Sequence, residues 1–253
     1  MQNTSIKKKE LQLFLQPKLL KILERASLFL KVYRSGKIPK ILRILPCLKN
    51  FEEVLWLTRP DTWSEQAIVI LTRFFLPKLD KNQLSRFYSL VLAPRLQETI
   101  FSSKSYSVHI KKAIKISTAY PSIFFSSIIL PICESKRCTN KEGVILSSII
   151  WKYKFPRSVI MSTLVRLTKQ PVTSAICMIL RVMISKNYLI SLRIIDLLID
   201  FFNLNNKKIT STHYKTLLLV FLKNYSDFLS IEDRKQFLIL KPEKNIYNFK
   251  KKY

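Results

Sequence analysis

The chain has 253 residues and a formal net charge of +28 at pH 7, because 44 lysines and arginines face only 16 aspartates and glutamates. A protein of that charge attracts polyanions whatever its fold. Glycine occurs only at Gly36 and Gly143, whereas glycine-rich phosphate loops and dinucleotide-binding turns need several glycines. The composition argues against a nucleotide-dependent enzyme, and 48% hydrophobic residues supply the material for a sizeable core.

Apolar residues recur at helical spacing from the beginning of the chain. Residues 11–33 predict a helix that restarts at Pro17, and residues 34–40 (Arg-Ser-Gly-Lys-Ile-Pro-Lys) predict a connector. Later helix starts are predicted where a capping residue stands three positions before an acid. These pairs are Asn50 with Glu53, Thr62 with Glu65, Thr139 with Glu142, and Ser230 with Asp233. Asp80 or Asn82 starts another helix, which must end or kink before Pro94.

The middle of the chain predicts a helix, a basic turn and a second helix. The first apolar segment runs into Pro131, and a tight turn follows that carries Cys133, Glu134, Lys136, Arg137 and Cys138. The second helix begins after Thr139. Residues 116–133 are uncharged and long enough to cross a bilayer, but they contain two prolines and several hydroxyl side chains. We expect a buried helix pair broken at Pro121 there and no membrane span.

The segment 188–202 is almost entirely apolar, and its charged residues Arg193, Asp196 and Asp200 line one stripe of a helix. This pattern indicates a core helix with a structural set of ion pairs, and not a catalytic pair of carboxylates. Strand signals are weak throughout. We therefore expect an all-α fold of about ten helices, stacked as helical hairpins in a degenerate HEAT-like α-solenoid. The predicted divisions are a basic N-terminal helix (1–33), a helical scaffold (34–240) and a basic aromatic tail (241–253).

No residues with catalytic or metal-binding spacing emerge. Cys133 and Cys138 have four residues between them and no second cysteine or histidine pair follows, so we interpret them as residues that shape a turn. His109 and His213 stand apart from any nucleophile motif. The few cysteines indicate a reduced, intracellular setting, and the first ten residues lack the features of a signal peptide. We expect no enzyme activity, cofactor or small-molecule substrate.

The distribution of charge is the most informative feature. Between Phe101 and Gln170 twelve lysines and arginines stand against only Glu134 and Glu142, whereas solvated helical surfaces normally mix the two signs. Nucleic acid is the favoured polyanion, and a membrane surface or an acidic protein is the alternative. The candidate RNA-binding residues are Arg34, Lys37, Lys40, Lys111, Lys112, Lys115, Lys136, Arg137 and Lys141.

Several stretches together resemble the bystin family. They are 34–40, Ile44-Leu45-Pro46, 52–58 with Pro60 and Trp63, Thr72-Arg73-Phe74, 86–92 with Pro94 and Arg95, 130–135 with Cys138 and Thr139, and 186–188 with Arg193 and Asp196. We interpret the chain as a shortened member of the family, without the family's long charged N-terminal extension. It also departs from the family by Lys136-Arg137 in place of small neutral residues and by Phe51 in place of tryptophan.

The resemblance implies a non-enzymatic factor for assembly of the small ribosomal subunit. Such a factor binds precursor rRNA, is associated with small nucleolar RNA, contacts assembly factors and ribosomal proteins, and supports pre-rRNA processing and 40S maturation. It implies a nucleolar and nuclear location, with cytoplasmic presence on exported precursors. The alternative hypothesis is a protein–protein adaptor that docks peptides on aromatic patches at Trp56, Trp63 and Trp151.

Overall fold

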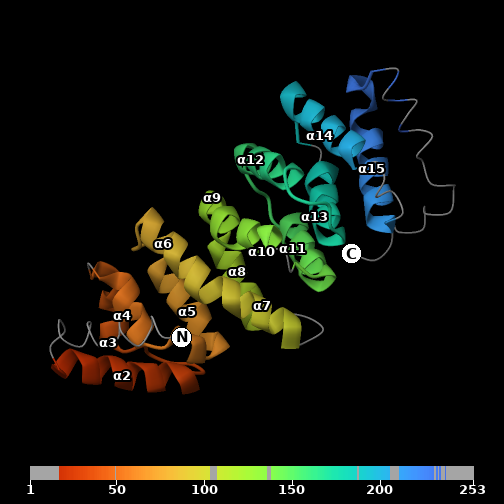
Figure 1. The fold of residues 1–253 in the computed structure, drawn as a ribbon. Coiled ribbons are helices and arrows are strands. Elements are labelled where there is room, and N and C mark those ends of the chain that lie inside the picture. The colour runs from red at the N-terminus through yellow and green to blue at the C-terminus, as the bar shows by residue number, and fades with distance from the viewer. Residues whose placement is uncertain are drawn as a thin grey trace. The chain divides into compact units, whose positions relative to one another are not determined.

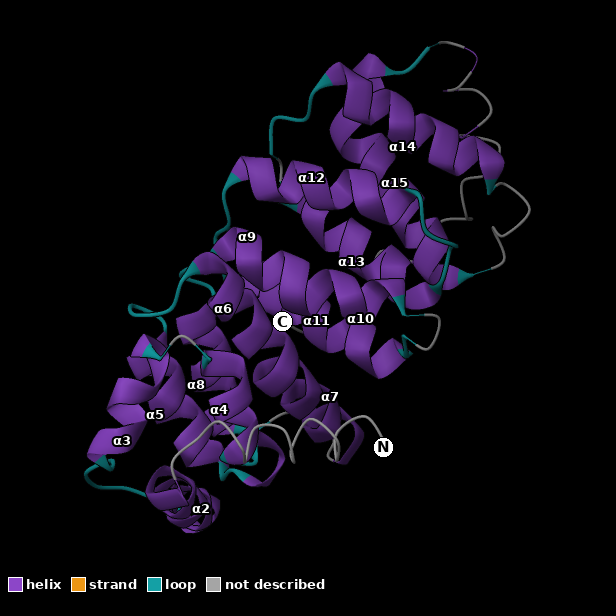
Figure 2. Cartoon of the chain, turned by 60° about the vertical axis from the view of Figure 1, so that its left-hand side comes forward, coloured by secondary structure: helices purple, strands orange, loops and turns teal. Residues whose placement is uncertain are grey.

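The computed structural model describes residues 17–48, 50–102, 107–135, 138–186, 188–205 and 211–230, together with residues 232, 234 and 237. Every regular element within these ranges is helical and none is a strand (Figure 2), which confirms the all-α prediction. Contacts divide the chain into two compact units, Met1–Ile128 and Ile129–Tyr253. The predicted tail 241–253 and residues 1–16 lie outside the described residues. The solenoid arrangement and the three predicted divisions of the chain stay predictions.

The first unit is built around the contact between two helices, α5 and α8 (Figure 1). Its α-helices are α2 (Pro17–Val32), α3 (Lys40–Ile44), α4 (Phe51–Leu57), α5 (Glu65–Phe75), α6 (Lys81–Phe87), α7 (Ala93–Ser102), α8 (Val108–Ser117) and α9 (Pro121–Phe124). Edge-to-face rings of Phe51, Phe75 and Phe87 join α4, α5 and α6, with centroid separations of 5.8 and 5.4 Å. Such pairs add to the free energy of apolar burial.

Two prolines are accommodated inside helical paths by π-helical turns. The turn η3 (Tyr88–Leu92) precedes α7, whose second residue is Pro94, and η4 (Phe125–Ile129) precedes α10 (Leu130–Glu134), whose second residue is Pro131. A proline ring clashes with the carbonyl four residues earlier in a regular α-helix, and a widened turn relieves that clash. The regular α-helix of α6 is therefore interrupted before Pro94, but the helical path continues through η3 into α7.

The predicted start of the central turn is wrong. Pro131, Cys133 and Glu134 are helical residues of α10, and the turn begins at Ser135, because the π-helical turn lets the helical path continue through Pro131. The predicted break at Pro121 is confirmed, since α8 ends at Ser117 and α9 begins at that proline. No helix among the described residues is both long and apolar enough to cross a bilayer.

The second unit is organised around α13, which is buried along most of its length and packs against both α11 and α15. Besides α10, its elements are α11 (Asn140–Lys152), α12 (Arg157–Thr168), α13 (Ser174–Ser185), α14 (Leu192–Leu204), α15 (Thr212–Tyr225) and η6 (Ser226–Phe228). The helices α11 and α13 approach so closely at Gly143 that an added Cβ would lie 2.7 Å from the Ala175 Cα.

Most predicted helix starts agree with the structure, and one is displaced. Thr139 caps α11: its hydroxyl accepts the Glu142 amide at 3.3 Å, and the Glu142 carboxylate accepts the Thr139 amide at 2.7 Å. Asp80 caps α6 and Asn50 precedes α4. The cap of α5 is Ser64 and not Thr62, whose hydroxyl instead donates to the Arg59 carbonyl. Asp233 lies outside the described residues.

The charged stripe of α14 is also where the sequence places it. Arg193, Asp196 and Asp200 are all exposed on one side of the helix, and its opposite side carries buried residues such as Leu198 and Phe202. In the described part of the chain these three charges form no ion pair with any residue. They therefore mark the solvent face of a core helix, and the predicted set of ion pairs is not seen.

Candidate nucleic-acid interface

The first predicted basic surface is a closed loop between α2 and α3. The Tyr33 hydroxyl donates to the Gly36 carbonyl at 2.8 Å, and Gly36 has φ 107°, a value that favours glycine. Ile38 is buried and fastens the far side of the loop, while Arg34, Lys37 and Lys40 are exposed. The loop therefore presents three cations from a fixed backbone.

The second predicted surface lies on α8. The apolar side of this helix, which includes Ile110, Ala113 and Ile114, is buried, and α8 packs on α5. Lys112 and Lys115 are exposed and Lys111 is half-buried. All three lysines lie on this one helix, and Lys111 is nearer its packed side.

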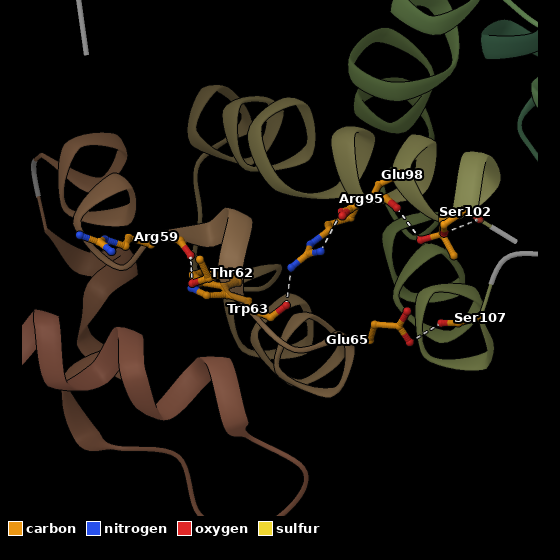
Figure 3. A network of polar contacts seen from close by, with 9 residues as sticks. Arg59, Thr62, Trp63, Glu65, Arg95, Glu98, Ser102 and Ser107 are labelled. Carbon is orange, nitrogen blue, oxygen red and sulfur yellow. Dashed lines mark hydrogen bonds and ion pairs between the residues drawn. The ribbon is translucent and has the colours of Figure 1, made fainter. Parts of the chain in front are cut away.

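The N-terminal end of α5 joins these two surfaces. Ser64 donates its hydroxyl to the Tyr33 carbonyl at 2.6 Å and accepts the Ala67 amide, so the helix cap also holds the end of the basic loop. The next residue, Glu65, accepts the hydroxyl of Ser107, the cap of α8, at 2.5 Å (Figure 3). The N-cap and the first residue of α5 thus fix the start of one basic surface and the start of the other.

The third predicted surface is the turn before α11 in the second unit. Lys136 and Arg137 lie outside the described residues, and Lys141 is exposed on the first turn of α11. The Cys138 amide donates to the Ser135 carbonyl at 3.1 Å and closes this turn. The structure thus places one of the three predicted cations and describes how the turn is anchored.

Both acids of this one-signed region are engaged in structural contacts. Glu134 pairs with Arg166 of α12 at 2.6 Å, and Glu142 is buried within the capping box of α11. Arg166, the partner of Glu134, is not one of the predicted RNA-binding residues. Exposed cations such as Lys112 and Lys115 supply the positive field that phosphate attraction requires.

Two further groups of cations were not singled out from the sequence. Arg59 is exposed and has φ 50°, a left-handed conformation that is rare for a residue with a side chain. Lys152, Lys154 and Lys186 gather at the end of α11. Lys152 and Lys154 belong to the segment in which the sequence shows an excess of basic over acidic residues. Lys186 joins them through a contact between distant parts of the chain, which local sequence does not reveal.

The cysteines and histidines form no arrangement that would activate a nucleophile or hold a metal. Burial raises the pKa of the Cys138 thiol to about 11, with a further contribution from Glu142, and burial also raises the pKa of the Cys133 thiol. His109 is half-buried on α8, 3.5 Å from the Gln66 amide, and His213 belongs to the other unit. No three potential metal ligands cluster among the described residues.

The three tryptophans differ in exposure. Trp63 is buried and its indole donates to the Thr58 carbonyl at 2.9 Å, so it is a core residue and does not dock a peptide. Trp56 and Trp151 are 48% and 55% exposed. Of the three tryptophans that the adaptor hypothesis names, only Trp56 and Trp151 are therefore exposed and able to contact a peptide.

Comparisons with known proteins give one consistent result. A sequence model of the bystin family matches residues 1–249. Bystin of Monosiga brevicollis is 30% identical over 236 residues, which are 92% of this chain and 57% of that protein. Bystin of Nematostella vectensis is 33% identical over 88% of this chain and 52% of its own length. Bystin of Homo sapiens is 33% identical over 74% of this chain and 43% of its own length. The chain spans about half the length of the curated relatives it matches.

Proposed function

The chain belongs to the bystin family, and from that premise we propose that it is a non-enzymatic ribosome-assembly factor that binds precursor small-subunit rRNA through its phosphates. Its partners in this proposal are neighbouring assembly factors and ribosomal proteins, and its sites of action are the nucleolus and exported precursor particles. In that role it supports pre-rRNA processing and 40S maturation.

One observation carries the proposal: exposed cations on a fixed helical framework form no ion pair with any of the residues that the structure describes. Arg34, Lys37, Lys112 and Lys115 are exposed and take part in no ion pair within the described chain, and the loop and helix that bear them are both held by α5. Fixed cations bind phosphates at a smaller cost in conformational entropy than cations on a mobile segment.

The test is a salt series of RNA affinities for the parent chain and for the double variant Lys112→Ala/Lys115→Ala. Each lost phosphate contact lowers the slope of log K against log salt by about 0.7 to 0.9. We expect the double variant to bind several-fold more weakly at low salt and to lose about 1.5 units of slope.

The matched control is Arg86→Ala, which removes an exposed cation that is already paired with Glu52 at 3.6 Å. We expect this variant to keep both the affinity and the salt slope of the parent. If the lysine double variant keeps the salt slope of the parent, α8 is not part of the RNA interface. If the affinity of the parent chain does not change with salt concentration, phosphate binding itself is contradicted.

The second candidate is a protein–protein adaptor, which is favoured by the two exposed tryptophans. An adaptor that works through apolar contact predicts binding to a purified assembly factor without RNA, with little dependence on salt. In that case Trp56→Ala or Trp151→Ala would weaken the complex, and the lysine variant would leave it unchanged.

A further inference from the structure

Lysines from two distant segments meet at the C-terminal end of α11. The Lys186 ammonium donates to the Tyr153 carbonyl and lies 5.7 Å from the centre of the Phe155 ring. The Lys152 ammonium lies 5.9 Å from the centre of the Tyr153 ring. Lys154 is exposed between them in the chain. Three positive charges are therefore concentrated around the short stretch of backbone from Lys152 to Phe155.

This stretch is also held in place by tyrosines. The Tyr188 hydroxyl donates to the Phe155 carbonyl at 3.0 Å, and the Tyr225 hydroxyl donates to the Tyr188 carbonyl at 3.0 Å. Phe155 is also buried, and the segment between α11 and α12 is held by Lys186 and Tyr188, while Tyr225 holds Tyr188 in turn. A ligand that binds there meets cations that are already positioned.

No carboxylate balances these lysines within the part of the chain that the structure describes. The ion pairs found there join other residues, and none includes Lys152, Lys154 or Lys186. Burial, and then the positive charge of Lys154, lower the pKa of the Lys186 ammonium. The lysines thus repel one another, and an anion bound among them would relieve that repulsion.

A large, exposed aromatic side chain directly precedes the lysine cluster in the chain. Trp151 is 55% exposed on the last turn of α11, and the same outer face carries Val144, Ser148 and, one helix length away, Lys141. The face extends for about 15 Å along the helix and bears no exposed acid, because Glu142 points into the core. An exposed indole beside unneutralised lysines is the combination that single-stranded nucleic acid recognises.

We propose that Trp151, Lys152, Lys154 and Lys186 form a binding site for single-stranded RNA, in which one unpaired base stacks on the indole and the adjoining phosphates contact the lysines. The inference rests on the proposed function and adds to it that this site reads an unpaired nucleotide, whereas the α8 lysines take any phosphate. Lysine is a compact charge suited to phosphate, and an isolated indole offers a stacking surface but no pocket for the side chains of an acidic peptide.

The test measures the affinity of the full chain for a 12-nucleotide uridine-rich single strand and for an RNA duplex of the same length. Loss of one base stack weakens single-strand binding by about 5- to 100-fold, which is the effect expected for Trp151→Ala. Duplex binding should remain at the parental value. Trp56→Ala is the matched control because Trp56 is exposed to a similar degree on the other unit, and it should change neither affinity.

A second probe isolates the stack from the charges. Single strands in which abasic sites replace the bases keep every phosphate, so the parent and Trp151→Ala should bind them equally. Lys152→Gln/Lys154→Gln should weaken binding to strands with and without bases alike and lower the salt slope. Circular dichroism checks that each variant retains its helices.

The outcomes separate this inference from the proposed function. If the parent binds RNA but Trp151→Ala binds the single strand equally well, the stacking site is wrong and phosphate binding stands. If the substitution instead weakens capture of a polyglutamate peptide and spares RNA, the site takes acidic protein and the inference is overturned. If the parent binds neither RNA, both proposals fail together.

Discussion

Gly143 marks the closest approach of two helices in the second unit. A Cβ at this position would meet the Ala175 Cα at 2.7 Å and its Cβ at 2.8 Å, and the first of these is backbone that cannot rotate away. Overpacking of this kind costs about 1–3 kcal/mol, while alanine gains about 1 kcal/mol in helix propensity. We expect Gly143→Ala to lower the free energy of unfolding by up to about 2 kcal/mol in denaturant titrations.

Ser148→Ala on the exposed face of the same helix serves as the control, and it should change stability by less than about 0.5 kcal/mol. Were Gly143→Ala instead to stabilise the chain by its propensity gain, α11 and α13 would have to lie further apart than the structure places them.

The cysteines differ in their access to solvent and in their readiness to ionise. Cys47 is exposed, Cys138 is half-buried with its pKa raised to about 11, and Cys133 and Cys177 are buried. The thiolate is the reactive form, so a raised pKa leaves little of it at pH 8 and more as the pH approaches 11. We expect iodoacetamide at pH 8 to modify Cys47 first, with Cys138 reacting faster at each step upward in pH. Mass spectrometry of peptides reads this order, and equal rates at Cys47 and Cys138 at pH 8 would contradict the burial of Cys138.

At the scale of elements, the N-terminal end of α5 stabilises both its own helix and the basic loop that follows α2, and the local sequence does not reveal the second contact. Ser64→Ala removes the cap of α5 and the hydrogen bond to the Tyr33 carbonyl that anchors the basic loop. A lost cap costs about 1 kcal/mol, so we expect a total loss of about 1–2 kcal/mol in the free energy of unfolding. Amide hydrogen exchange in the loop 34–38 should also become faster.

Thr62→Ala is the natural comparison, since the sequence assigns the cap to Thr62 and the structure assigns it to Ser64. The Thr62 hydroxyl makes an exposed contact with the Arg59 carbonyl, and its loss should cost less than about 0.5 kcal/mol. A larger cost for Thr62→Ala than for Ser64→Ala would favour the assignment made from sequence.

These elements also show which features of the fold can be predicted from the sequence. The box of Thr139 and Glu142 was predicted correctly because its donors and acceptors lie within four residues of one another. Two hydroxyl residues precede α5 two positions apart, and the choice between them depends on Tyr33 and Leu30, which are distant in sequence. The helical path through Pro131 was missed because π-helical turns have no recognisable local pattern.

At the scale of the molecule, the composition predicts the excess of positive charge, but the sequence predicts only part of where that charge lies on the structure. Helical periodicity placed Lys112 and Lys115 on an exposed face, since spacing along a helix decides which residues point outward. Lys186 joins Lys152 and Lys154 through a contact across more than thirty residues of sequence, which no local pattern contains. Membership of the bystin family was recognisable from the spelling of several stretches together.

The positive field itself is a property of the whole chain, and it makes every RNA contact sensitive to salt. Such a field attracts any polyanion, so affinity for RNA alone does not identify a role in ribosome assembly. A ribosome-assembly factor must also be found on one class of RNA in preference to the others.

Ultraviolet crosslinking in cells that express the tagged chain, followed by sequencing of the attached RNA, tests the central claim most directly. The proposed function predicts crosslinks concentrated in precursor small-subunit rRNA and reduced by Lys112→Ala/Lys115→Ala. Crosslinks scattered in proportion to RNA abundance would mean that the charge attracts RNA without selection, and they would contradict the assignment to small-subunit assembly through rRNA.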